Sequence, residues 1–284
     1  MEVITQINEM RTWVLSVKDR KKSIGFVPTM GALHDGHISL MRSARSENDE
    51  LIVSIYLNPT QFDNNVDFDN YPRELNRDIE IIRKENADVV FAPSTEEMYP
   101  DGFCTNVRQD RINDALCGRV RPGHFNGVTT IVTKLFNIIK PDRAYFGQKD
   151  YQQSVVIKRL VADLNMDIDI QVCPTVREED GLALSSRNER LNHEERQNAL
   201  CIYGSLLKAK AMFASNIRDA KEIIEEMTSI IKKTKHTKVD YISIVNTRTL
   251  EDLSLINEKA LAAVAVWIGN TRLIDNTILE QNHA

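Results

Sequence analysis

Two histidines three positions apart, His34 and His37, stand in the string PTMGALHDGH at residues 28–37. An apolar run precedes the string and an apolar-periodic segment follows it, which predicts a short strand, a tight turn and the first turn of a helix. Both imidazoles then lie on one face of that turn, and Gly36 between them lets another group approach the backbone closely. Because a helix N-terminus offers unpaired N–H groups and a positive dipole end, these residues predict a site for an anion, with nucleotide phosphate preferred.

Two other interpretations of the histidine pair stay open. A His-x-x-His spacing also supplies two zinc ligands, but a zinc site needs a third ligand and the strand-to-helix loop offers none nearby. Two surface histidines without a function are the plainer alternative, because short motifs carry false positives.

Two further polar segments lie in predicted loops. The segment NPTQF at 58–62 follows a predicted strand, and its Asn58 and Gln61 are neutral groups suited to hydroxyls and amides, although Asn-Pro usually marks only a turn. The segment GRVRPGHFNGV at 118–128 places Arg121, His124 and two glycines before an apolar helix. This favours an anion contact, against the alternative of a solvated basic loop.

Two segments later in the chain also suit a nucleotide. In GQKDYQQ at 147–153, Lys149 can neutralise phosphate charge and Asp150 can accept hydrogen bonds from ribose hydroxyls; a surface ion pair is the alternative. In LSSRN at 184–188, two serine hydroxyls and Arg187 can close over a triphosphate. The alternative there is a helix-entry loop with a serine cap.

The elements that must position these residues alternate between strand and helix in the first half of the chain. The predicted strands are 24–27, 51–57, 89–92, 143–146 and 168–173, and the predicted helices are 38–46, 75–85, 128–139 and 152–164. Such alternation predicts a parallel sheet with helices on both sides. In these sheets ligands bind outside the carboxyl ends of the strands, where the polar segments of the first half fall.

The second half changes character near Val176. Two long helical patterns at 193–213 and 219–234 precede strands at 239–245, 262–268 and 271–274, which predicts a small α+β domain. We therefore expect a nucleotide- and substrate-binding domain at 1–176 and a smaller domain at 177–284. The join at residues 174–181 is polar and contains Pro174 and Gly181, so its residues 176–181 are expected to act as a hinge for a lid.

Bulk composition excludes several classes of protein. The chain has 284 residues, of which 42% are hydrophobic and 27% charged, and its net charge of −5 argues against a nucleic-acid binder. The longest apolar run, 260–268, is too short to span a bilayer, and no basic region followed by an apolar core opens the chain, so we expect a cytoplasmic protein with no membrane partner. Four cysteines without a Cys-x-x-Cys spacing are expected to be buried or idle thiols.

The histidine string resembles the signature of the HIGH-type nucleotidyltransferases. The longer string PTMGALHDGH is similar to that of the pantothenate synthetase family, also called pantoate/β-alanine ligases, and five ordered motifs extend the resemblance over nearly the whole chain. The resemblance implies a Rossmann-like doubly wound parallel sheet with a smaller C-terminal α+β lid domain. It also implies ATP-dependent condensation of (R)-pantoate with β-alanine through a pantoyl adenylate, with release of AMP and pyrophosphate. Magnesium as cofactor and a homodimer are implied as well.

The resemblance further assigns roles to residues that match the family's motifs. It implies catalytic roles for His34, His37, Lys149 and Arg187, with His37 as proton donor. The implied ATP-binding residues are Met30, Gly31, His34, Gly36, His37, Gly147, Gln148, Lys149, Asp150, Val176, Leu184, Ser185, Ser186 and Arg187. The implied substrate-binding residues are Asn58, Gln61, Arg121, His124 and Gln153, and the acidic residue near magnesium is Asp78. Leu184 stands where many members of the family have Met.

Two rival functions are weighed beside this one. Another adenylyltransferase or synthetase of the same superfamily would share the phosphate-binding segments, but the chain lacks the basic appended domain that tRNA recognition needs. A non-catalytic nucleotide sensor would keep the phosphate site and could lose Gln61 and Gln153, yet both are present.

Overall fold

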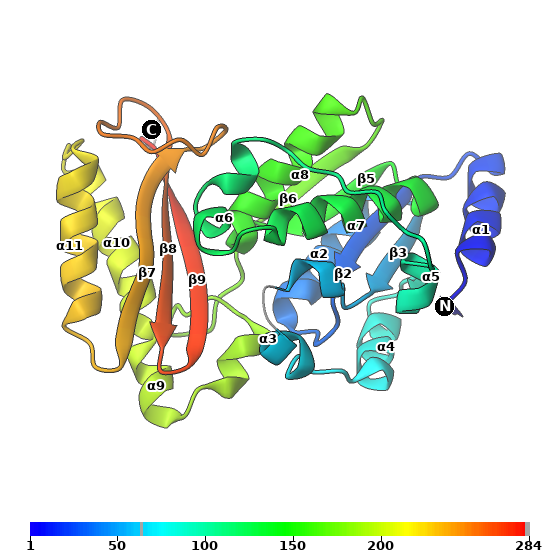
Figure 1. Cartoon of the computed structure of the whole chain (residues 1–284), viewed down its shortest axis with the longest axis horizontal. Coiled ribbons are helices and arrows are strands. Elements are labelled where there is room, and N and C mark those ends of the chain that lie inside the picture. The colour runs from blue at the N-terminus through cyan, green and yellow to red at the C-terminus, as the bar shows by residue number, and fades with distance from the viewer. Residues whose placement is uncertain (63–64, 282–284) are drawn as a thin grey trace. The chain divides into compact units, whose positions relative to one another are not determined.

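The structure is a computed structural model that describes residues 1–62 and 65–281. The chain divides into two compact units, each with its own sheet (Figure 1). The first unit comprises Met1–Asn113, Arg121–Gln148 and Val156–Pro174; the second comprises Asp114–Val120, Lys149–Val155 and the chain from Thr175 onward. The second unit thus takes in two short segments that lie N-terminal to residue 176.

The first unit is built on six parallel strands in the order β1-β4-β3-β2-β5-β6. The strands are β1 (Glu2–Ile4), β2 (Ile24–Thr29), β3 (Glu50–Ile55), β4 (Val89–Phe91), β5 (Arg143–Gly147) and β6 (Asp169–Cys173). From β2 the chain first builds the β3 side of the sheet and later the β5 side, so the strand order reverses between β2 and β5. This reversal confirms the predicted Rossmann-like doubly wound sheet and marks the crevice where such sheets bind ligands.

Helices cover both faces of this sheet. The helices of this unit are α1 (Ile7–Asp19), α2 (Asp35–Glu47), α3 (Asn65–Asp69), α4 (Leu75–Lys84), α5 (Thr95–Met98), α7 (His124–Ile139) and the C-terminal part of α8 (Tyr151–Asp163). On one face Val27 of β2 joins a buried cluster with Met41 of α2 and Ile82 of α4. On the other face the ring of Phe26 lies 6.3 Å from that of Phe136 on α7. Because successive side chains of a strand point to opposite faces, a strand covered on both sides reads as a continuous apolar run.

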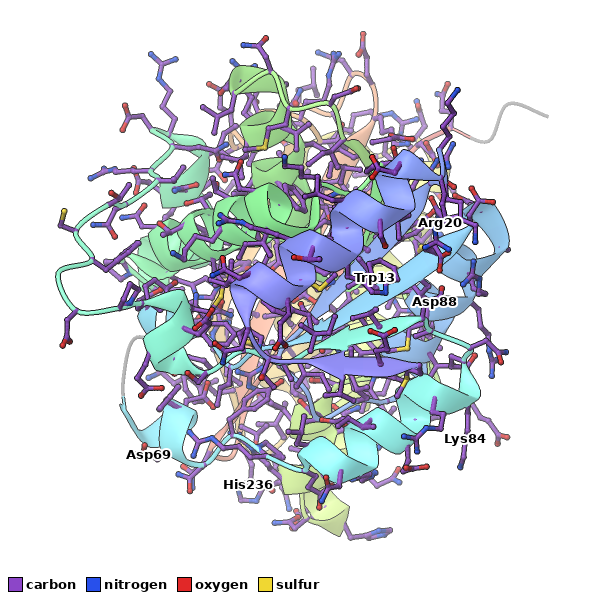
Figure 2. All side chains as sticks on the ribbon, turned by 90° about the vertical axis from the view of Figure 1, so that its right-hand side faces the viewer. Trp13, Arg20, Asp69, Lys84, Asp88 and His236 are labelled. Atoms are coloured by element: carbon purple, nitrogen blue, oxygen red, sulfur yellow. The ribbon has the colours of Figure 1, made fainter. Side chains whose placement is uncertain are left out.

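The first strand and helix were not predicted. Residues 1–23 carry no predicted element, yet β1 pairs with β4 at the edge of the sheet and α1 follows it. Figure 2 shows α1 with Trp13 and, beyond its last turn, Arg20. The buried residues of α1, Met10, Val14 and Val17, recur at helical spacing, so the signal for the helix was present in the sequence.

The second unit holds an antiparallel sheet in the order β7-β8-β9, which confirms the predicted α+β fold of this part. Its elements are α6 (Cys117–Val120), α9 (His193–Asn198), α10 (Leu200–Ala214), α11 (Ala220–Lys232), β7 (Thr237–Asn246), β8 (Ala260–Ile268) and β9 (Thr271–Leu279), with short 3-10 turns η3 (Gln148–Asp150, partly in the first unit) and η4 (Ser186–Arg190). Alternate residues of β8, from Ala260 to Ile268, join one apolar core with α10 and α11. The single helix predicted at 193–213 is in fact two, interrupted at Ala199.

Short 3-10 turns also punctuate the loops of the first unit. They are η1 (Pro59–Gln61) and η2 (Ile112–Asp114, whose last residue belongs to the second unit). Over the part of the chain that the structure describes, no helix combines the length and apolar composition needed to cross a bilayer.

Candidate active site

The histidine pair begins helix α2, as predicted. His34 is the N-cap, and its Nδ1 accepts a hydrogen bond from the backbone N–H of Gly36 at 3.2 Å. His37 Nδ1 accepts the backbone N–H of His34 at 3.3 Å, and the two ring centroids are 4.2 Å apart. A Cβ at Gly36 would stand 2.8 Å from Cε1 of His34, so only glycine leaves room for this ring. The two imidazoles are therefore held by the backbone of the turn that they begin.

These hydrogen bonds fix which ring nitrogen carries the proton. A ring nitrogen that accepts a hydrogen bond has no proton of its own, so each neutral imidazole holds its proton on Nε2. Both rings can then donate through Nε2–H to an anion at the helix N-terminus, where the dipole is also favourable. The geometry suits hydrogen-bond donation to phosphate oxygens.

The turn before His34 is strained and is held by Asp78. Gly31 and Ala32 have positive φ angles of 81° and 52°. The two carboxylate oxygens of Asp78 accept the N–H groups of Ala32 and Leu33, each at 2.9 Å, and Asp78 is only 2% exposed. Among the described residues, no three His, Cys, Asp or Glu side chains gather to hold a metal ion. The contacts of Asp78 are thus to backbone N–H groups, while its expected role near magnesium stays a prediction.

The loop after β3 brings Asn58 and Gln61 together in η1. Asn58 is 1% exposed, and its Nδ2 donates to Gln61 Oε1 at 3.1 Å and to the carbonyl of Gly127 at 3.2 Å. Its Oδ1 accepts from the hydroxyl of Tyr99 at 2.9 Å, a donor that stays protonated because burial raises the pKa of Tyr99. The Nε2 of Gln61 donates to Met30 Sδ at 2.9 Å. Asn58 therefore orients the Gln61 amide beside the histidine turn.

Arg121 and His124 both contact the backbone of the Asn58–Gln61 loop. His124 Nδ1 is 2.6 Å from the carbonyl oxygen of Gln61, and Arg121 donates to that oxygen at 3.2 Å. Helix α7 can approach η1 this closely because of Gly127, where a Cβ would stand 2.4 Å from the carbonyl oxygen of Thr60. Two predicted substrate-binding residues, Arg121 and His124, thus contact the backbone of a third, Gln61.

The sheet topology gathers the predicted site residues of the first unit at one edge. The histidine turn follows β2, Asn58 and Gln61 follow β3, and Gly147 and Gln148 end β5 or follow it. Strands β3, β2 and β5 are neighbours in the parallel sheet, so their carboxyl ends lie side by side. A Cβ at Gly147 would meet no other atom within 4 Å. The predicted residues of this unit therefore surround the switch point between β2 and β5.

The remaining predicted residues belong to the second unit. The side chain of Lys149 is 19% exposed, and its Nζ lies 3.8 Å from the carboxylate of Asp150. The backbone carbonyl of Lys149 accepts a hydrogen bond from Nδ2 of Asn276, a buried residue of β9, at 2.9 Å. Gln153 is half-buried on α8. Asn276 was not expected at the site, and no pattern in the sequence points to it.

The serine-arginine loop is anchored within the second unit. Arg177 pairs with the buried carboxylate of Asp275 on β9 at 2.6 Å and donates to the carbonyl of Gly181 at 3.0 Å. The N–H of Leu184 donates to the carbonyl of Val176 at 3.0 Å, which folds the segment back on itself. Gly181 has φ of +96° and lies against the ring of Tyr203, where no Cβ would fit. Arg177 was missed although it adjoins a predicted site residue.

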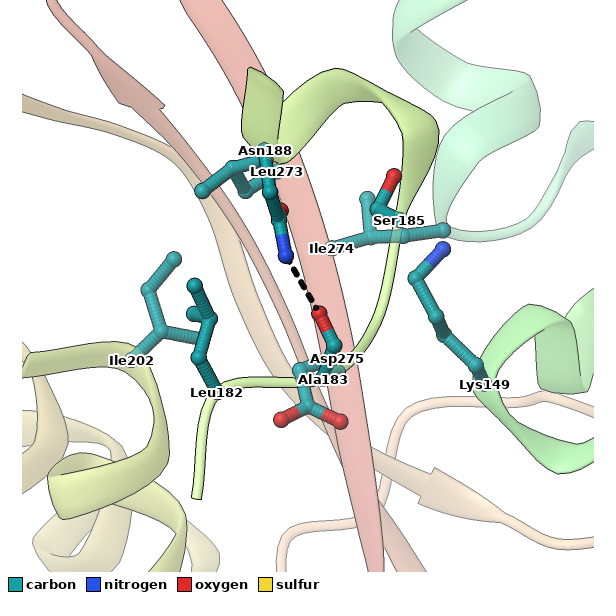
Figure 3. A pocket seen from close by; sticks show the side chains of 9 residues that line it. All are labelled: Lys149, Leu182, Ala183, Ser185, Asn188, Ile202, Leu273, Ile274 and Asp275. Carbon is teal, nitrogen blue, oxygen red and sulfur yellow. Dashed lines mark hydrogen bonds between the residues drawn. The ribbon is translucent and has the colours of Figure 1, made fainter. Parts of the chain in front are cut away.

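Directly after this folded-back segment, Ser185 caps the 3-10 turn η4. Its Oγ accepts the N–H of Arg187 at 3.3 Å, which is the capping contact considered as an alternative for this loop. Ser186 and Arg187 follow within η4, both half-buried. Lys149 and Ser185 line one cavity of about 10 Å³, shown in Figure 3. This volume holds about one water molecule, so the cavity is no substrate pocket.

The four cysteines differ in their exposure. All four are free thiols; Cys104 is exposed, Cys201 is partly buried, and Cys117 and Cys173 are buried. Burial raises the pKa of Cys173 and of Cys201, which keeps both in the unreactive thiol form. The expectation of buried thiols is confirmed for Cys117 and Cys173, and that the thiols are idle stays a prediction.

Comparison with known proteins places the chain in a family. The pantoate-beta-alanine ligase family matches residues 2–278. Pantothenate synthetase of Thermotoga petrophila is 54% identical over 279 residues, covering 98% of this chain and 100% of the relative. The crystal structure of pantothenate synthetase from Thermus thermophilus superimposes with a TM-score of 0.93 at 40% identity, covering 99% of this chain and 100% of that one.

A second solved structure was determined with ligands. Pantoate-beta-alanine ligase from Francisella tularensis, complexed with beta-gamma ATP and beta-alanine, matches with a TM-score of 0.82 at 39% identity over the whole of both chains. The matched span, the identity and the shared fold together show that this chain belongs to the pantoate-beta-alanine ligase family.

Proposed function

We propose that this chain condenses (R)-pantoate with β-alanine in two steps driven by ATP. The condensation follows from membership of the ligase family and from relatives that align with the chain from end to end. The observation that carries the proposed route is the pair of imidazoles at the N-terminus of α2, each with its Nδ1 accepting a backbone N–H. Two Nε2–H donors beside a helix dipole suit charge that develops on phosphate oxygens.

In the first step the pantoate carboxylate attacks the α-phosphorus of ATP. A new P–O bond forms as the bond to the β-phosphate breaks, which gives pantoyl adenylate and pyrophosphate. In the second step the amine of β-alanine attacks the acyl carbon, loses a proton and displaces AMP. No side chain becomes acylated, in keeping with protonated, buried Cys173 and partly buried Cys201.

The side chains are assigned roles in these steps by their chemistry. His34 and His37 would donate to phosphate oxygens, with His37 as proton donor, and Lys149 and Arg187 would neutralise charge on the phosphates. Ser185 and Ser186 would contact the triphosphate. The other ATP-binding residues would be Met30, Gly31, Gly36, Gly147, Gln148, Asp150, Val176 and Leu184. Pantoate and β-alanine would contact Asn58, Gln61, Arg121, His124 and Gln153. These assignments are supported by the convergence of the first-unit residues on the switch point between β2 and β5.

Magnesium is proposed to enter with the nucleotide. Magnesium is usually held by substrate phosphates, water and one or two carboxylates. The described residues do not form an all-protein cage for it, and both oxygens of Asp78 already accept backbone N–H groups. We therefore propose that ATP phosphates supply most of the ligands. The ion, when bound, would offset the negative charge of the triphosphate.

We further propose a domain motion, the partners, the location and the oligomeric state of the enzyme. Residues 177–284 would act as a lid on the domain formed by residues 1–176, with the polar segment 176–181 as hinge. The net charge of −5 supports small-molecule partners rather than nucleic acid. A cytoplasmic location and a homodimer complete the proposal, as the resemblance to the family implies.

Product analysis tests the proposed reaction. Purified protein with ATP, magnesium, pantoate and β-alanine should release AMP, pyrophosphate and pantothenate in equal amounts. ADP with phosphate in place of AMP would show acyl-phosphate chemistry and exclude the adenylate route. Nucleotide binding without any product would instead identify a sensor.

A further inference from the structure

Asp78 makes backbone contacts that its expected role near magnesium does not explain. It lies in the first turn of α4, is 2% exposed, and uses one carboxylate oxygen for the N–H of Ala32 and the other for the N–H of Leu33. Both distances are 2.9 Å, typical of a good hydrogen bond to a charged acceptor. A buried carboxylate is costly unless it is satisfied in this way. Its buried position therefore depends on the turn, and the turn depends on it.

The backbone that Asp78 holds has an unfavourable conformation. Gly31 and Ala32 both have positive φ, and Ala32 carries a Cβ that disfavours this region. A Cβ at Gly31 would stand 2.8 Å from Oδ2 of Asp78, so the carboxylate approaches the turn where only glycine leaves space. Such conformations persist where surrounding contacts over-determine them. Two charge-assisted hydrogen bonds supply that restraint.

The restrained turn leads straight into the histidine pair. Leu33, whose N–H is bound by Asp78, buries its side chain in the cluster that includes Ile82 of α4. The next residue, His34, is the N-cap of α2 and gives its own N–H to His37. Any shift of the Ala32 and Leu33 peptides therefore moves the N-cap, and with it both imidazoles.

We propose that Asp78 is a positioning residue for adenylation, which sets the two histidines by clamping the turn before them. It acts from α4 through the backbone of the turn, and this role needs no contact with the magnesium ion. The proposal rests on the proposed adenylation chemistry, but its first test is made without ATP, pantoate or metal. Failure of the positioning role can thus be told from failure of the reaction.

The test compares Asp78→Asn with Glu80→Gln in the full-length protein. Asparagine keeps one oxygen acceptor but turns an NH₂ group toward a backbone N–H. Glu80 lies two positions on in α4, with its side chain 61% exposed and paired with Arg83 of the same helix, so Glu80→Gln removes the same charge without touching the turn. In ligand-free, metal-free protein, nitrogen NMR of labelled histidine should show altered ring signals of His34 and His37 in Asp78→Asn. The control should match the wild type.

Kinetics separates clamping from metal binding. Asp78→Asn should lower the pantoate-dependent pyrophosphate exchange rate at saturating substrates by about a hundredfold, the scale expected for an ångström of misplacement. The magnesium concentration for half-maximal exchange should not change. Unaltered histidine signals in folded Asp78→Asn, or a raised magnesium requirement with a normal saturating rate, would overturn the proposal.

A second variant tests the proposal if Asp78→Asn does not fold. Gly31→Ala disturbs the same junction from the side of the turn, since its Cβ would press on Oδ2 of Asp78, and leaves the carboxylate itself in place. It should reproduce the loss of exchange rate and the altered histidine signals, with the magnesium requirement unchanged. A wild-type rate in Gly31→Ala would contradict the clamp, whatever the stability of Asp78→Asn.

Discussion

The side-chain amide of Asn276 donates to the backbone carbonyl of Lys149 at 2.9 Å, across 127 positions of sequence. Asn276 lies on β9 and is 4% exposed, and the hydrogen bond is partly buried. The last strand of the second unit thus fixes the backbone of a lysine to which we assign the neutralisation of phosphate charge. Asn276 should therefore matter for the rate although no role in binding ATP is assigned to it.

Asn276→Ala should slow adenylation more than it weakens ATP binding. Loss of the donor leaves a partly buried carbonyl without this partner, which costs roughly 1 kcal/mol and allows the Lys149 backbone to shift. Single-turnover formation of pantoyl adenylate should fall by about fivefold on that scale. Thr277→Ala, at the next position of the same strand and only partly buried, serves as control. Equal rates for the two variants would show that the hydrogen bond is only structural.

Substitutions at His34 should separate helix capping from chemistry. Asparagine is a favoured N-cap, whereas alanine at the N-cap costs roughly 1 kcal/mol. His34→Asn should keep the wild-type melting temperature but lower the exchange rate by more than about tenfold, because the Nε2–H donor is gone. His34→Ala should lose both stability and rate. A wild-type rate in His34→Asn would remove the imidazole from the mechanism.

ATP should protect the segment 177–190 from proteolysis. Arg190 is exposed and offers a trypsin site just beyond Ser185, Ser186 and Arg187, which we propose to contact the triphosphate. If the segment closes over ATP, cleavage there should slow as ATP and magnesium approach saturation. The exposed tryptic site at Arg20, on the other unit, reports general protease activity. Equal cleavage at Arg190 with and without ATP would count against closure.

Thiol labelling should leave the reaction intact. At a pH of about 7.5 iodoacetamide should modify exposed Cys104 first, because burial raises the pKa of Cys173 and of Cys201 and holds them as thiols. Labelling of these two should rise as pH rises toward their elevated pKa values. Protein alkylated at Cys104 alone should keep its full rate, as measured by mass spectrometry and by product release. Loss of activity in step with that labelling would point to a thiol in the mechanism.

The sequence predicts those parts of the site that are made by contiguous residues. The strand, turn and helix around His34 and His37 can be read from apolar periodicity and glycine spacing, and the structure has β2 and α2 there. The parallel order of the strands then places Asn58 and Gln61 beside the histidine turn, because neighbouring strands share one carboxyl edge. Resemblance to a known family supplied the remaining roles.

Contacts between distant residues could not be predicted in this way. Asp78 binds the turn from 46 positions away, and Asn276 reaches Lys149 from 127. Both are hydrogen bonds between a side chain and a backbone group, and they depend on loop conformation, such as the positive φ of Ala32, rather than on a repeating pattern. Each exists only in the folded backbone and leaves no local pattern in the sequence.

Isotope exchange tests the central claim most directly. Wild-type enzyme with ATP, magnesium and pantoate, but no β-alanine, should transfer label from pyrophosphate into ATP, because the first step is complete and reversible by itself. Omission of pantoate should abolish the exchange, and addition of β-alanine should convert it into net release of AMP and pantothenate. If the enzyme makes pantothenate under these conditions yet shows no pantoate-dependent exchange, the pantoyl adenylate route is contradicted.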